Sequence, residues 1–242
     1  MPESDFDVAG LANHLHLSPA QILRLAERGQ VPGRRVGGEW RFHPTEIHHW
    51  WEQRIGLADE QQLAEMELAL RGPRGQSALE QFSLVDFLPV EGIELQMQAR
   101  TRNAVFPALI ELASRTEIVW DTSRLEDALR AHEDLHSTAM DNGAAILHPR
   151  RPLPGILADA LILIGRTSNG IPFGNPRGVM TDVFFVLCML DDRSHLRMLA
   201  RLSRLLTDTN FLDDVRSAVS PIALRETLAV TERRVLGTTG DD

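Results

Sequence analysis

Three short, strongly apolar runs constrain the fold of this chain more than any other feature. They are AAIL at 144–147, ADALILIG at 158–165 and VFFVLCML at 183–190. Glycine, proline or charged residues bound each run, which is typical of central strands buried on both faces of a sheet. None approaches the roughly 18–20 apolar residues that a membrane-spanning helix needs, so we expect no membrane helix.

Helical patterns alternate with these runs. A strand-like stretch at 92–98 is followed by amphipathic segments at 99–116, 123–134 and 194–206, and the pair Ser220-Pro221 begins a last helix. The alternation predicts a layered α/β domain with a central mixed sheet over residues 82–242.

The N-terminal part has a different pattern. Residues 8–28 form two short helices, with Ser18 as the cap and Pro19 as the first residue of the second helix, and Gly29 ends it. Gly37-Gly38 lies between two β-compatible arms and suits a two-residue hairpin turn. Pro44 then begins a helix whose apolar residues close a small core, namely Ile47, Trp50 and Trp51. The order predicts a winged helix-turn-helix, a layout that places its second helix in the major groove of DNA.

The two parts meet in a segment without periodicity. Residues 59–70 predict one more amphipathic helix, and RGPRGQSA at 71–78 contains only glycine, proline and polar or charged residues apart from one alanine. We therefore expect a helix-turn-helix domain at 1–56, a helix and linker at 57–81, and the α/β domain at 82–242.

Composition narrows the class of protein further. The chain is 43% hydrophobic, its formal net charge is −9, and every basic residue is arginine, so non-specific adhesion to nucleic acid is not expected. The single cysteine, Cys188, lies in an apolar run, which predicts a packed thiol and no internal disulfide. The N-terminus has neither a basic start nor an apolar stretch, so we expect a cytoplasmic protein.

Residues 7–54 resemble the excisionase-like, MerR-type helix-turn-helix. The resemblance rests on Leu-Ser-Pro at 17–19, the apolar helix that ends at Gly29, and the Val-Gly-Gly-X-Trp-Arg-Phe hairpin at 36–42. It implies binding of double-stranded DNA, and paired modules imply a homodimer. The candidate phosphate or base contacts are Arg24, Arg28, Arg34, Arg35 and Arg41.

Residues 82–232 resemble the enzyme IIA component of the sugar phosphotransferase system, fructose/mannitol type, which includes the nitrogen-regulatory IIA proteins. Three matches in the right order carry the resemblance: 128–150, GIPFG at 170–174, and HLRMLARLSRLLTD at 195–208. The resemblance implies that His148 accepts a phosphoryl group from the histidine phosphocarrier protein, and that His195 is the family's second histidine. Ser137 and Thr138 would hold the phosphoryl oxygens, and no cofactor is required.

The chain departs from that family at several positions. His132 stands where the family has an arginine, and His136, Ala139 and Asp141 stand where it has glycines. The substitutions create the pattern H-E-x-x-H at 132–136, which by itself predicts a zinc site only weakly. A set of four imidazoles, His132, His136, His148 and His195, is the better-motivated site for zinc or another divalent metal.

These observations leave three functions open. The first is a DNA-binding transcriptional regulator with a phosphoryl-accepting or sensory IIA-like domain. The second is a metal- or ligand-binding sensor that is not phosphorylated, and the third is a phosphoryl carrier with a vestigial N-terminal module. The other histidines are predicted to be surface or small-core residues of the N-terminal domain: His14, His16, His43, His48 and His49.

Overall fold

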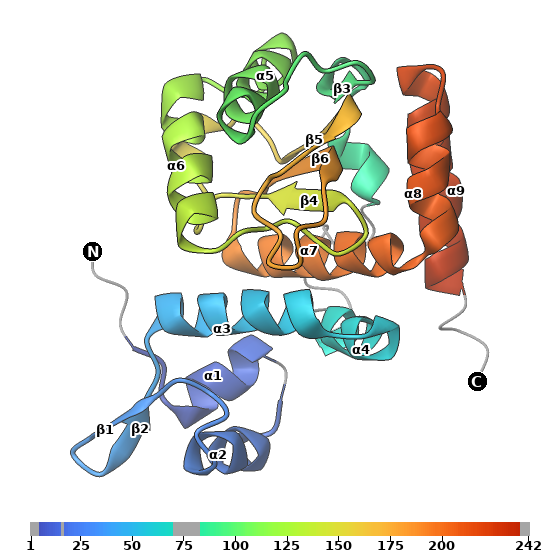
Figure 1. Cartoon of the computed structure of the whole chain (residues 1–242). Helices are drawn as coiled ribbons and strands as arrows, with labels where there is room; N and C mark the ends of the chain where they lie inside the picture. The colour runs from blue at the N-terminus through green and yellow to red at the C-terminus, as the bar shows by residue number, and fades with distance from the viewer. Residues whose placement is uncertain (1–4, 16, 70–82, 238–242) are drawn as a thin grey trace.

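The computed structural model describes residues 5–15, 17–69 and 83–237. The N-terminal domain has the predicted order of elements: α1 (Val8–Leu15), α2 (Pro19–Glu27), β1 (Arg34–Val36), β2 (Glu39–Arg41) and α3 (Pro44–Leu57). The antiparallel pair β1–β2 is the wing, which lies beside α2 at the end of the molecule farthest from the large domain (Figure 1).

Local chemistry explains where these elements begin and turn. Ser18 caps α2 by accepting a hydrogen bond from the backbone N–H of Gln21, whose side chain in turn accepts from the backbone N–H of Ser18. Gly37 and Gly38 have φ angles of +62° and +87°, which suit a tight hairpin turn and which other residues adopt only with strain. Pro44 begins α3, as predicted.

The C-terminal domain is built on a four-stranded sheet with the order β3-β5-β6-β4. The β3–β5 and β4–β6 pairs are parallel, and the β5–β6 pair is antiparallel, so the sheet is mixed. The strands are β3 (Ile93–Glu94), β4 (Ala144–Leu147), β5 (Leu161–Ile171) and β6 (Thr181–Cys188). The helices are α5 (Arg102–Arg115), α6 (Thr122–Leu135), α7 (Asp192–Thr207), α8 (Thr209–Ser217) and α9 (Pro221–Gly237).

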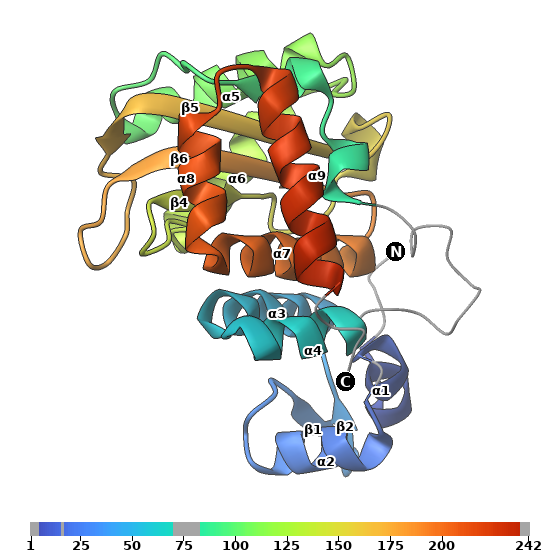
Figure 2. The ribbon, with the colours of Figure 1, turned by 90° about the vertical axis from the view of Figure 1, so that its right-hand side faces the viewer.

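Both faces of the sheet are covered, which confirms the prediction made from the apolar runs. Along β6, Phe184 and Val186 belong to the cluster of buried side chains under α5 and α6, while Phe185 and Leu187 belong to the cluster under α7–α9. Figures 1 and 2 show the resulting three layers. The predicted strand at 92–98 forms a ladder only over Ile93–Glu94, and α8 is an additional helix that periodicity did not predict.

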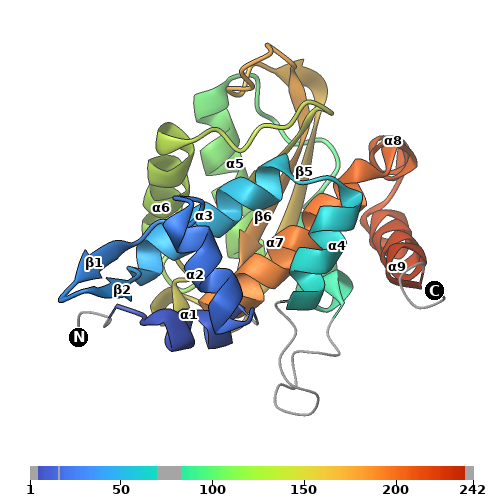
Figure 3. The same ribbon diagram turned by 90° about the horizontal axis from the view of Figure 1, so that it is seen from below.

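The N-terminal domain packs on the large domain through two helices. The predicted helix at 59–70 is α4 (Glu60–Ala69), and both α3 and α4 contact α7 (Figures 2 and 3). A single cluster of buried apolar side chains runs from Ile47 of α3 and Leu63 of α4 to Leu199 of α7. The predicted joint at 71–78 lies outside the described residues. No described helix is both long and apolar enough to cross a bilayer.

Candidate functional site

His148 lies directly after the last residue of β4 and is only 6% exposed. Its Nδ1 atom is 2.9 Å from the backbone carbonyl oxygen of Ile146. Because a carbonyl oxygen can only accept, we assign the proton to Nδ1, which donates to Ile146. In the neutral ring, Nε2 then carries a free lone pair, available to a phosphoryl group or a metal.

His195, in the first turn of α7, lies next to the His148 ring. Asp191 caps this helix, accepting a hydrogen bond from the backbone N–H of Ser194 at 2.9 Å. The rings of His195 and His148 have centroids 5.0 Å apart, and His195 is 1% exposed. Burial lowers the pKa of His195 to about 4, so its imidazole is neutral at pH 7.

Two further groups enter from α3 of the N-terminal domain. Glu52 Oε1 lies 3.0 Å from His48 Nε2, 3.3 Å from His148 Nε2 and 3.6 Å from His195 Nε2. His48 is therefore not simply a small-core residue of its own domain, because it is buried against the large domain. We call the group His48, Glu52, His132, His148 and His195 the histidine pocket.

The histidine pocket holds an ionised carboxylate among imidazoles. Burial alone would raise the pKa of the Glu52 carboxyl, but the imidazoles of His148, His195 and His48 hold that pKa well below its usual range. Burial also lowers the pKa of His132 to about 3. Within the part of the chain that the structure describes, both Glu52 oxygens and the Nε2 atoms of His48, His148 and His195 lack a partner in hydrogen-bond geometry.

Of the four imidazoles predicted to share a metal, three converge and one does not. His132 lies edge-on to His148, with ring centroids 4.4 Å apart. His136 is exposed and stacks on His49 at 4.7 Å. The α6 helix ends at Leu135, so the second histidine of the H-E-x-x-H pattern lies beyond the helix and not one turn along the same face.

The predicted phosphate-holding hydroxyls are hydrogen-bonded to Glu133. Ser137 Oγ donates to Glu133 Oε1 at 2.8 Å, and Thr138 Oγ1 donates to Glu133 Oε2 at 2.6 Å. Burial raises the pKa of Glu133, and these hydrogen bonds oppose that effect. Glu133 therefore organises the loop after α6, and the general-base role that the H-E-x-x-H pattern implies has no support in this geometry.

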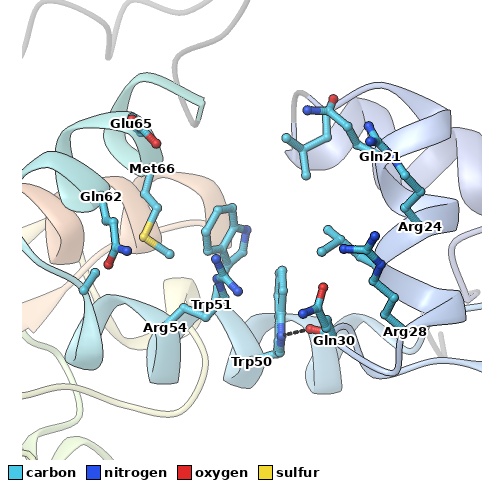
Figure 4. Close-up of a pocket in the computed structure, with 13 residues that line it drawn as sticks. Gln21, Arg24, Arg28, Gln30, Trp50, Trp51, Arg54, Gln62, Glu65 and Met66 are labelled. Atoms are coloured by element: carbon cyan, nitrogen blue, oxygen red, sulfur yellow. Dashed lines mark hydrogen bonds between the residues drawn. The ribbon is translucent and has the colours of Figure 1, made fainter.

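The candidate DNA contacts lie on α2 and the wing. Arg24 of α2 and Arg28, the C-cap residue directly after it, are exposed and line a cleft of about 680 Å³, with Trp50 and Arg54 of α3 on its other side (Figure 4). Trp50 Nε1 donates to the backbone carbonyl of Gln30 at 2.7 Å and so fixes the floor of this cleft.

The wing arginines each contact a neighbouring side chain. Arg34 pairs with Asp5 at 2.9 Å but remains 67% exposed, and Arg41 pairs with Glu39 at 2.8 Å. The guanidinium of Arg35 lies 5.2 Å from the centroid of the Trp40 ring. All three remain on the surface of the hairpin, at least partly exposed.

Two family matches cover most of the chain. Residues 86–230, more than half of the chain, match the family described as "Phosphoenolpyruvate-dependent sugar phosphotransferase system, EIIA 2". The chain belongs to the EIIA 2 family. Residues 6–55 match a helix-turn-helix domain family, so both predicted resemblances are confirmed.

Solved structures share the fold of the EIIA domain. The nitrogen regulatory protein IIA-Ntr from Neisseria meningitidis is 24% identical with a TM-score of 0.55, and the match covers 60% of this chain and 98% of that chain. The IIA mannitol protein from Escherichia coli is 16% identical with a TM-score of 0.50, and the match covers 58% and 97%. A comparison with curated proteins gives no match.

The contribution of α3 to the histidine pocket was not predicted from the sequence. His48 and Glu52 are four residues apart, so they share one helical face, while Ile47, Trp51 and Ile55 are buried in the adjoining apolar cluster. The available clue was that this polar pair lies beside the large apolar side chains Ile47 and Trp51, because polar groups next to an apolar helix face are often buried and then need partners.

Proposed function

We propose that this protein is a DNA-binding transcriptional regulator whose EIIA domain accepts a phosphoryl group on Nε2 of His148. The observation that carries the proposal is the orientation of the His148 ring. Its Nδ1 proton is committed to the Ile146 carbonyl, so Nε2 is the nucleophile, and it faces His195 across the histidine pocket.

The transfer is a simple exchange of nitrogen–phosphorus bonds. The bond between phosphorus and the donor imidazole of the phosphocarrier protein breaks as the bond to His148 Nε2 forms, and the donor nitrogen leaves with the electron pair. The neutral His195 ring is placed to donate a hydrogen bond to a phosphoryl oxygen. Imidazole replaces the family's arginine at His132, so we expect weaker stabilisation of the phosphoryl charge than in a typical family member.

Glu52 makes the reaction depend on the position of α3. Its carboxylate lies 3.3 Å from His148 Nε2, in the space that an incoming phosphoryl group needs. Two unit charges about 4 Å apart repel by about 4 kcal/mol at an effective dielectric constant of 20. A phosphoryl group on His148 and Glu52 in its docked position therefore exclude one another, and phosphorylation releases α3 from the EIIA domain.

The test is intact-mass spectrometry of the full chain after incubation with phosphoenolpyruvate and the general phosphotransferase enzymes, in buffer containing EDTA and a larger amount of Mg²⁺. We expect one acid-labile phosphate that is absent in His148→Ala. Glu52→Gln should be labelled at least about 10-fold faster, since even that increase uses only about 1.4 kcal/mol of the repulsion. Labelling that survives His148→Ala, or no labelling while a standard IIA protein is labelled in parallel, would contradict the proposal.

DNA binding requires its own experiment. The probe is a duplex selected from a random-sequence pool, and binding is measured by fluorescence anisotropy at several salt concentrations. Replacing Arg34 or Arg35 by Gln should weaken binding and lower the salt slope by about 1 for each phosphate that is no longer neutralised. Arg115→Gln, on α5 of the EIIA domain, is the matched control and should leave both quantities unchanged. A dimer would place two α2 helices on neighbouring half-sites.

A second function, a sensor that binds a metal and is not phosphorylated, is favoured by one observation. Five buried side chains that can ligate a metal converge in the histidine pocket, and several of their donor atoms have no hydrogen-bond partner among the described residues. Absence of phosphate on His148 together with stoichiometric metal would select this function.

A further inference from the structure

The arrangement of donor atoms around Glu52 is unusual for a carboxylate held by hydrogen bonds. Glu52 is 8% exposed, and the three histidines whose Nε2 atoms surround its Oε1 atom are 1–6% exposed. The distances from Oε1 to these nitrogens are 3.0, 3.3 and 3.6 Å, yet none of the contacts has hydrogen-bond geometry. Buried polar atoms are rarely left without partners, so the arrangement needs a further explanation.

The contact between His148 and Glu52 is the least favourable of the three. The Nδ1 atom of His148 donates to Ile146, so in the neutral ring Nε2 presents a lone pair to the negatively charged Glu52 oxygen at 3.3 Å. Two electron-pair donors then face each other in a site shielded from water, which is unfavourable unless a proton or a metal cation lies between them. A metal ion would satisfy all of these atoms at once.

We propose that the histidine pocket binds one divalent metal ion of the zinc class, with Glu52 of the N-terminal domain as the central ligand. His48 and His195 form a group of three with Glu52 in which all ligand atoms lie within 4.8 Å of one another, and Glu52 also belongs to a second such group with His132 and His148. The first group supplies three protein ligands and leaves the fourth position open, as in many zinc sites. In a tetrahedral site with bonds of 2.0–2.1 Å, neighbouring ligand atoms are roughly 3.3 Å apart. The distances of 3.0–3.6 Å bracket that value.

The surroundings of His48 and His148 support this assignment. Histidines that bind a metal usually direct their other ring nitrogen at a carboxylate or a backbone carbonyl. His48 Nδ1 lies 3.3 Å from Asp192 Oδ1, within ion-pair distance but without hydrogen-bond geometry, and His148 Nδ1 donates to the Ile146 carbonyl. Imidazole and carboxylate together suit zinc and its neighbours in the first transition series better than magnesium or calcium.

The metal would join the two domains. His48 and Glu52 lie on α3, whereas His195 lies on α7 and His148 follows β4, so one ion would bind both sides of the interface. The ion would also lie beside His148 Nε2, which is 3.3 Å from Glu52 Oε1 and is the same atom that the phosphorylation proposal uses. Metal binding and phosphorylation therefore compete, although the metal site does not depend on phosphorylation.

The experiment uses the tag-free full chain, dialysed against EDTA and then titrated with Zn²⁺ alone. We expect one equivalent of zinc by elemental analysis and a rise in the melting temperature that grows with free Zn²⁺. His48→Gln and Glu52→Gln each remove a ligand, so each should weaken zinc binding by more than the roughly 10–100-fold typical of losing a supporting residue. His136→Gln is the matched control, because that ring stacks on His49 and should leave the affinity unchanged.

Several outcomes would overturn the site. They are the absence of stoichiometric zinc, unchanged affinity in both His48→Gln and Glu52→Gln, and loss of affinity in His136→Gln. If the ligand variants fail to fold, X-ray absorption on the zinc-loaded wild-type chain decides, and fewer than two imidazole ligands contradicts the proposal. The titration contains no phosphoryl donor and the labelling contains EDTA, so failure of one proposal is distinguishable from failure of the other.

Discussion

Glu67 of α4 offers the sharpest test of how firmly the N-terminal helices are docked. It is 1% exposed, and its carboxylate lies 2.6 Å from Arg201 and 3.7 Å from Arg204, both on α7. Arg201 also pairs with Glu232 of α9 at 3.1 Å. The change Glu67→Gln keeps the shape of the side chain and removes its charge, so it isolates the ion pair from the packing.

The expected loss of stability follows from burial. Removing one partner of a buried ion pair costs about 3–5 kcal/mol, because the remaining charge stays in a poorly solvated site. Arg201 retains Glu232, so we expect the lower end, about 3 kcal/mol. In a chain of 150–250 residues each kcal/mol lowers the melting temperature by roughly 2–4 °C, which gives a fall of about 6–12 °C.

The assay is urea denaturation together with differential scanning calorimetry. Glu65→Gln is the matched control, since Glu65 lies on the same helix but is exposed, and it should change the free energy of unfolding by less than about 0.5 kcal/mol. A decrease below about 1 kcal/mol in Glu67→Gln, or equal decreases in the two variants, would refute the argument that this buried pair fixes α4 on α7.

Two further predictions concern the packing of each domain. Burial raises the pKa of the Cys188 thiol to about 12, so at pH 8 it stays protonated, and Ellman's reagent should label it only in denaturant; fast labelling of the folded chain would contradict this. A Cβ at Gly33 would lie 2.7 Å from the fully buried Phe42 ring, so Gly33→Ala should lower the free energy of unfolding by about 1–3 kcal/mol in urea denaturation. Gly56→Ala in α3 is the control: a Cβ at Gly56 would meet nothing within 4 Å, so the free energy of unfolding should rise by up to about 1 kcal/mol. If Gly33→Ala proved the more stable of the two variants, the argument from the close approach of Phe42 would be refuted.

Much of the fold was predictable because its determinants are local. The apolar runs at 144–147 and 183–190 became β4 and β6, and the pairs Ser18-Pro19 and Ser220-Pro221 mark where α2 and α9 begin. The helix α8 escaped prediction because it follows α7 almost directly, with Asp208 as the cap of α8 immediately after the last residue of α7. Periodicity alone does not separate two helices that are joined so closely.

The site was predictable only in part, because half of it depends on contacts between the domains. His148 and His195 could be placed from their motifs, and the structure brings them together with His132. His48 and Glu52 lie in a segment whose local pattern predicts a helix of the small N-terminal domain and nothing more. Their place in the histidine pocket depends on how α3 packs on α7, which no short-range pattern contains.

Under the proposed phosphorylation of His148, the position of Glu52 couples the two domains reciprocally. The wing and α2 lie on the far side of α3 from the EIIA domain, so docking of α3 leaves the candidate DNA contacts uncovered (Figure 1). A phosphoryl group at His148 would therefore act on DNA binding through the placement of the whole N-terminal domain and, in a dimer, through the spacing of its two α2 helices. Docking of Glu52 disfavours the phosphorylated form of His148 by some factor. By linkage, phosphorylation of His148 must disfavour docking by the same factor. The labelling equilibrium of Glu52→Gln relative to the wild type therefore reports how strongly the EIIA domain can move the DNA-binding domain.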